Sequence, residues 1–144
     1  MYIAYGSVQD NSHHGSTKLH TDLTDAVNIM VWAAARQQGQ QGHALWHIFP
    51  QAASPVICDY LKNHAGYSES GNPIHSQSIY FTPAMLDDLA TRYGVRAFTI
   101  YQQPGEAIYI PAGCAHQVCT LVHRLNPPRE LTIITTGKQP DGCY

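Results

Sequence analysis

The sequence predicts a single-domain antiparallel β-sandwich or jelly-roll barrel that carries a helical insert. Three observations lead to this fold class. Short segments rich in β-branched and aromatic residues alternate with turn-forming segments, two helical patterns interrupt them, and 144 residues make about one domain. The predicted strands are residues 1–5, 17–22, 26–32, 44–49, 76–81, 97–102, 106–111 and 117–122.

Two helices are predicted in the middle of the chain. The first runs from about residue 55 to residue 64 and has Ser54 as its N-cap. The second, residues 83–93, is capped by Thr82 and ends at Gly94. Apolar residues recur on one face of each helix, so we expect both helices to pack on the sheets.

The ends and loops are less regular. Residues 36–42 and 63–73 are predicted to be loops, because they are polar and rich in Gln, Gly, Ser and Asn. The segment 123–144 fits the strand pattern poorly, and the pair Pro127–Pro128 interrupts any strand that precedes it.

Composition excludes several classes of function. Charged residues are only 12% of the chain, and ten acidic against eight basic side chains give a net charge of −2, so direct nucleic-acid binding is not expected. No apolar run approaches the roughly 20 residues of a membrane span, and we expect no membrane attachment and no secretory signal. The four cysteines lack CxxC spacing, which favours a reducing compartment over a disulfide framework or a structural zinc site.

The first chemical motif is His20-Thr21-Asp22. Residues i and i+2 of a strand point to the same face, so the imidazole of His20 and the carboxylate of Asp22 are expected to converge. Taken alone, the motif is weak and better suits a partly buried, hydrogen-bonded histidine.

The second motif has the spacing G-x5-P-x-G-x2-H and comprises Gly105, Pro111, Gly113 and His116. A strand of alternating faces leads into a turn shaped by proline and glycine, which presents His116 at the mouth of the barrel. The spacing resembles the second cupin motif. Together with the first motif it provides two histidines and one carboxylate, the facial triad of non-heme Fe(II) oxygenases. Iron is preferred, and manganese and nickel remain alternatives.

The chain resembles the JmjC domain of the JMJD1/KDM3 group, the histone H3 lysine-9 demethylases. The matching stretches are MYIAYG, GSTKLHTDLTDAVNIMVW, ALWHIF, PIHSQSIYF and RYGVRAFTIYQQPGEAIYIPAGCAHQV. The resemblance implies a mainly β fold, a double-stranded β-helix (cupin-like jelly roll) with two inserted α-helices. It places the JmjC-like domain at residues 1–122, incomplete at its N-terminal side, with residues 123–144 as an unaligned tail.

The resemblance also implies an activity. Fe(II) is the expected cofactor and 2-oxoglutarate the co-substrate, with oxidative removal of methyl groups from a methylated histone H3 tail or another protein substrate in the nucleus. The family's iron ligands match His20, Asp22 and His116, and the residues that match 2-oxoglutarate contacts are Thr17, Asn28 and Arg36. The last three have plainer interpretations: a strand threonine, a polar residue near a turn and a surface charge.

Three alternatives stay open at the level of sequence. A related oxygenase could hydroxylate a protein side chain with the same metal motif. A catalytically silent JmjC fragment could serve as a structural or interaction module. A cupin domain with another metal would need only the three ligands and the jelly roll.

Overall fold

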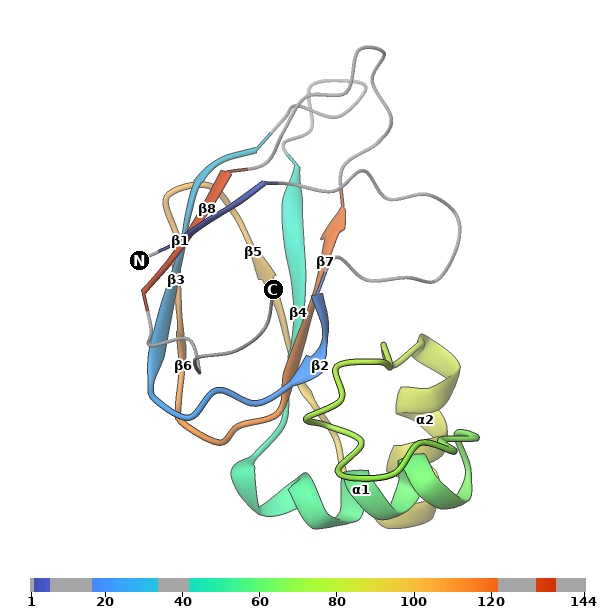
Figure 1. The fold of residues 1–144 in the computed structure, drawn as a ribbon. Coiled ribbons are helices and arrows are strands. Elements are labelled where there is room, and N and C mark those ends of the chain that lie inside the picture. The colour runs from blue at the N-terminus through green and yellow to red at the C-terminus, as the bar shows by residue number, and fades with distance from the viewer. Residues whose placement is uncertain (1, 6–16, 34–41, 122–131, 137–144) are drawn as a thin grey trace.

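Two four-stranded antiparallel sheets face each other in the computed structural model, which describes residues 2–5, 17–33, 42–121 and 132–136 (Figure 1). The first sheet has the order β1 (Tyr2–Tyr5), β8 (Thr132–Thr136), β3 (Ala26–Trp32), β6 (Ala107–Ile110). The second has the order β2 (Thr17–His20), β7 (His116–Leu121), β4 (His43–Ile48), β5 (Phe98–Gln102). The prediction of a mainly β fold with antiparallel sheets and two helices is confirmed.

The predicted strand at residues 76–81 is wrong, because the structure has no strand there. Gln77 adopts a φ of 50°, in the left-handed region, which interrupts an extended chain. The main chain of Phe81 pairs with a side chain instead: its N–H donates to Oε1 of Gln117 at 2.7 Å, and its carbonyl accepts from Nε2 at 2.9 Å. The amide of Gln117 therefore replaces one residue of a neighbouring strand.

The segment 123–144, which fits the strand pattern poorly, contains β8. This strand lies between β1 and β3 and pairs with both. Its five residues, TIITT, are all β-branched, which is the strand signal that the preceding proline pair obscured. The proline pair and residues 36–41 lie outside the described residues, and the domain boundary at residue 122 stays a prediction.

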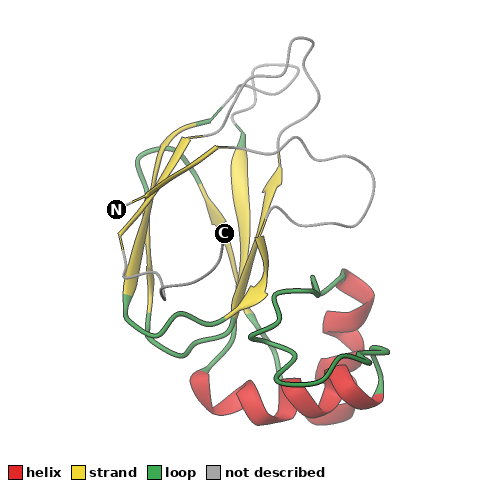
Figure 2. Ribbon diagram, in the orientation of Figure 1, coloured by secondary structure: helices red, strands yellow, loops and turns green. Residues whose placement is uncertain are grey.

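Both helices lie beside one end of the second sheet, as Figure 2 shows in red. The 3-10 helix η2 (Gln51–Ala53) leads directly into α1 (Ser54–Asn63), and α2 (Pro83–Tyr93) follows the long loop. Neither is long and apolar enough to cross a membrane. Helix α2 has the predicted ends, because Thr82 Oγ1 accepts from the amide of Met85 and Gly94 has a left-handed φ of 68°.

Ser54 is not the N-cap of α1, contrary to the sequence-based prediction. The cap is Ala53, because η2 winds into the longer helix and Ser54 already has helical geometry. The hydroxyl of Ser54 is buried and has no hydrogen-bond partner.

Thr82, which caps α2, and Ser54, which does not cap α1, give a matched pair of stability variants. Thr82→Ala should lower the free energy of unfolding by about 1 kcal/mol, because the amide of Met85 loses its acceptor. Ser54→Ala should leave it within about 0.5 kcal/mol, because no hydrogen bond is lost. Urea unfolding of the two variants checks this prediction. Equal losses would show that the capping assignment is wrong.

Apolar side chains gather in two clusters. One fills the space between the sheets and contains Ala26, Met30, Ala33, Ala44, Trp46, Ile48, Ile108, Ile110 and Val118. The other joins the helices to the end of the second sheet and contains Leu19, Phe49, Ala53, Ile57, Tyr60, Leu61, Ile74, Phe81, Leu89 and Ala115. Leu19 and Ala115 are each one residue from a histidine of the predicted triad, so the triad lies where the two clusters meet.

Candidate metal centre

The structure brings His20, Asp22 and His116 together. His20 ends β2 and His116 begins β7, and the two residues are direct partners in the antiparallel register. Asp22 follows β2. Its Oδ1 lies 3.8 Å from Nε2 of His20, and its Oδ2 lies 3.8 Å from Nε2 of His116. One nitrogen or oxygen from each residue lies within 4.8 Å of the other two.

The second nitrogen of each imidazole is held by a main-chain carbonyl. Nδ1 of His20 lies 2.8 Å from the carbonyl oxygen of Lys18, and Nδ1 of His116 lies 3.0 Å from that of Cys114. Because a carbonyl only accepts hydrogen bonds, Nδ1 carries the proton in the neutral form of each ring. Each Nε2 then presents its lone pair toward Asp22, as in metal-binding histidines whose other nitrogen is held in this way.

The surroundings keep His116 neutral. Its side chain is almost fully buried, and burial followed by the neighbouring imidazole of His20 lowers the pKa of His116 to about 4. The indole of Trp46 stacks on its ring, with the ring centres 6.2 Å apart and an interplanar angle of 25°. A neutral imidazole is the form that binds a metal ion.

The turn before His116 is tied to the segment that carries Asp22. The amide of Gly113 donates to the main-chain carbonyl of Asp22 at 2.9 Å, and the amide of Ala112 donates to the carboxylate of Asp25 at 2.8 Å. Gly113 has a φ of 73°, and a Cβ there would lie 2.8 Å from Nε2 of Gln51. Glycine is therefore needed at this position, and the two sequence motifs form one structural unit.

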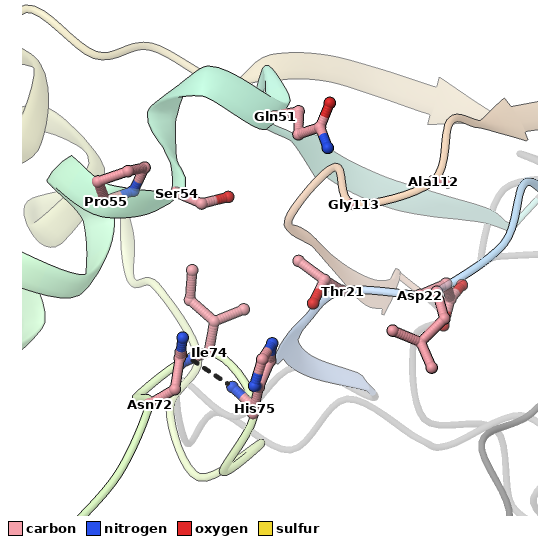
Figure 3. A pocket seen from close by; sticks show the side chains of 11 residues that line it. Thr21, Asp22, Gln51, Ser54, Pro55, Asn72, Ile74, His75, Ala112 and Gly113 are labelled. Atoms are coloured by element: carbon pink, nitrogen blue, oxygen red, sulfur yellow. Dashed lines mark hydrogen bonds between the residues drawn. The ribbon is translucent and has the colours of Figure 1, made fainter.

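A cavity of about 500 Å³ opens beside Asp22 (Figure 3). Its walls come from four parts of the chain: the segment after β2, η2 with the start of α1, the loop at residues 72–75 and the turn at residues 112–113. The side chain of Gln51 borders this space, and Asn72 lies across it on the loop. Apart from Asp22, the described side chains that line it are neutral polar or apolar groups and the imidazole of His75.

The two predicted 2-oxoglutarate contacts that the structure describes, Asn28 and Thr17, lie on different sheets. Asn28 is 5% exposed on the inner face of β3, where its neighbours Ala26 and Met30 belong to the cluster between the sheets. Thr17 is exposed at the first residue of β2. Arg36 lies outside the described residues, so its role stays a prediction.

Sequence analysis missed three residues near the triad. Trp46 could be predicted only as a core residue, because it alternates with Ala44 and Ile48 on the inner face of its strand. Gln102 is fully buried at the end of β5, and a glutamine in an inward position was its signal. Asp25 gave no signal in the sequence. Hydrogen bonds from the hydroxyl of Tyr109 and the amide of Ala112 lower its pKa.

Comparison with known proteins agrees with the geometry. Residues 12–126 match the family described as "JmjC domain, hydroxylase". Lysine-specific demethylase 3 of Drosophila melanogaster is 33% identical over 156 residues, covering 84% of this chain and 18% of that protein.

Two further relatives have similar names and similar coverage. Lysine-specific demethylase JMJ29 of Arabidopsis thaliana is 29% identical over 181 residues, covering 83% of this chain and 20% of the relative. Lysine-specific demethylase 3A of Homo sapiens is 30% identical over 155 residues, with coverages of 84% and 12%. The chain spans a fifth or less of the length of these three curated relatives. The expected resemblance is confirmed, and the chain belongs to the JmjC family.

Proposed function

We propose that this chain is an Fe(II)- and 2-oxoglutarate-dependent oxygenase of the JmjC type that removes methyl groups from a lysine of a histone H3 tail in the nucleus. One observation carries the proposal. Two imidazoles, each with Nδ1 against a main-chain carbonyl, and one carboxylate converge at the meeting of β2 and β7. This donor set, two histidines and one carboxylate, suits the facial triad that holds Fe(II) and leaves positions open for other ligands.

The strand order supports a double-stranded β-helix. The orders β1-β8-β3-β6 and β2-β7-β4-β5 place the first four strands alternately in the two sheets, and the last four strands alternate again. Such an arrangement is the two-sheet, eight-stranded form of a jelly roll. We infer that the sheets form this fold, with α1 and α2 inserted between β4 and β5.

In this proposal the protein holds the metal ion and orients the side chains that bind it. Bound Fe(II) with 2-oxoglutarate supplies the oxidation of the methyl group by O₂. His20, Asp22 and His116 hold the ion, and the carbonyls of Lys18 and Cys114 hold the imidazoles at fixed angles. Asn28, a buried polar side chain on the inner face of β3, supports a 2-oxoglutarate contact between the sheets. Thr17 and Arg36 stay predicted contacts.

The cavity beside Asp22 supports a protein substrate. It is open to the surface and adjoins the triad, so a side chain of a bound peptide could reach the metal from it. The amides of Gln51 and Asn72 offer neutral hydrogen-bonding groups of the kind that pair with a peptide main chain. The names of the relatives, lysine-specific demethylases, favour a methylated lysine as the reacting side chain.

The printed family description, "JmjC domain, hydroxylase", favours a second candidate: hydroxylation of a protein side chain. The same metal centre serves both reactions, and the products separate them. Demethylation releases formaldehyde and leaves lysine with one methyl group fewer. Hydroxylation leaves a stable product that is 16 Da heavier.

The test combines the purified chain with Fe(II), 2-oxoglutarate, O₂ and a dimethyl-lysine H3 peptide. We expect succinate and formaldehyde to form in equal amounts, with a loss of 14 Da from the peptide. A gain of 16 Da without formaldehyde would establish the hydroxylase instead. Absence of both products together with absence of Fe(II) binding would support the silent module.

A further inference from the structure

A buried polar cluster adjoins the metal centre without belonging to it. Trp46, Gln102 and Asn28 are 2%, 0% and 5% exposed, and they lie among the apolar side chains between the sheets. Buried polar groups are costly unless hydrogen bonds satisfy them. In this cluster Gln102 provides the connecting hydrogen bonds.

The chemistry of the partners determines the orientation of the Gln102 amide. The indole N–H of Trp46 can only donate, so the group 2.8 Å from it is the carbonyl oxygen Oε1. Nε2 then faces acceptors alone: the carbonyl oxygen and Oδ1 of Asn28, each at 3.2 Å, and the carbonyl oxygen of Glu106 at 3.1 Å. A flipped amide would break every one of these contacts, so a single orientation is selected.

The cluster connects the two sheets to a predicted metal ligand. Asn28 lies on β3 of the first sheet, whereas Gln102 and Trp46 lie on β5 and β4 of the second. The indole of Trp46 in turn stacks on the imidazole of His116. Gln102 thus forms hydrogen bonds both with a ring that stacks on the predicted metal ligand and with the residue predicted to contact 2-oxoglutarate.

We infer that Gln102 is a positioning residue of the metal centre. It holds the Trp46 indole at one angle, so that the indole fixes the plane of the His116 imidazole and the direction of its Nε2 lone pair. It touches neither the metal ion nor the reacting atoms. The inference rests on the proposed function, because it requires His116 to be a metal ligand.

The test is metal binding by the variant Gln102→Met, which retains much of the side-chain volume and removes the hydrogen bonds. Trp32 is 43% exposed, so Trp32→Phe leaves Trp46 as the only tryptophan and provides the background for all measurements. Anaerobic titration with Co(II), a spectroscopic substitute for Fe(II), is followed by Trp46 fluorescence and by the Co(II) absorption bands. Gln103→Met, at the exposed neighbouring position, is the matched control.

We expect Co(II) binding to quench Trp46 in the background protein. Gln102→Met should weaken binding tenfold or more and shift the Co(II) bands, as removal of an outer partner of a metal ligand typically does. Gln103→Met should change neither. Unchanged affinity and bands in a cooperatively unfolding Gln102→Met protein would overturn the inference. If the background protein itself binds no Co(II), or His116→Ala binds it equally, the proposed metal centre fails instead.

A second variant keeps the test decisive if Gln102→Met does not fold. Trp46→Phe retains an aromatic ring against His116 and removes the indole N–H that pairs with Gln102. We expect it to shift the Co(II) absorption bands and weaken binding. Bands identical to those of the unmodified protein would show that the angle of the stacked ring has no influence on the metal centre, which contradicts the inference.

Discussion

Replacing His116 with alanine is expected to abolish Fe(II) retention and 2-oxoglutarate turnover while the fold remains largely intact. The variant removes one of the three converging ligand side chains. Alanine can adopt the extended backbone conformation of the first residue of β7. Asp22→Ala should have the same effect, because Asp22 supplies the only negative charge of the three ligands. Metal analysis after anaerobic loading and succinate formation measure the two losses, and circular dichroism checks the fold.

The control for this prediction is His64→Ala. His64 is exposed at the end of α1 and pairs with the hydroxyl of Tyr93, so its removal changes the number of histidines without touching the triad. It should retain Fe(II) and turnover at the level of the unmodified chain. Wild-type turnover in His116→Ala or Asp22→Ala would refute the facial triad.

Gln117→Leu is expected to lower the free energy of unfolding by about 3 kcal/mol or more, which is a larger loss than that expected for Thr82→Ala. Gln117 is fully buried, and its amide satisfies both main-chain groups of Phe81 and contacts Nδ1 of His47. Leucine leaves those groups without a partner in an apolar environment, at about 1–3 kcal/mol for each buried group. Urea unfolding measures the change.

The matched control for this prediction is Gln103→Leu, the same substitution at an exposed position. Its effect should stay within about 0.5 kcal/mol, because surface substitutions rarely exceed that range. A loss in Gln117→Leu no larger than in the control would mean that the Phe81 segment is held by its apolar contacts alone.

Features that depend on a few consecutive residues could be predicted from the sequence. Short segments rich in β-branched and aromatic residues predicted seven of the strands, and Thr82 and Gly94 predicted both ends of α2. The spacing of His20 and Asp22, and that of Gly113 and His116, predicted which side chains would meet. In each case the deciding interaction lies within one strand, one helix or one turn.

Other features depend on residues that are distant in the sequence. The 76–81 segment has strand composition, yet Gln117, 36 residues beyond Phe81, pairs with its main chain. Serine is a residue type typical of an N-cap, yet the preceding 3-10 helix makes Ser54 the first residue inside α1. β8 is identified by its antiparallel pairing with β1 on one side and with β3 on the other.

The candidate metal centre shows the same division. The sequence by itself determined the three ligand types and their local geometry, because strand alternation and the glycine turn act over a few residues. Only the tertiary structure decided that His20 lies opposite His116, that Trp46 stacks on it, and that Gln102 pairs with Asn28 at a separation of 74 residues. The physical reason is that backbone preferences extend over a few residues, whereas the partner of a buried polar group is selected by the packing of whole sheets.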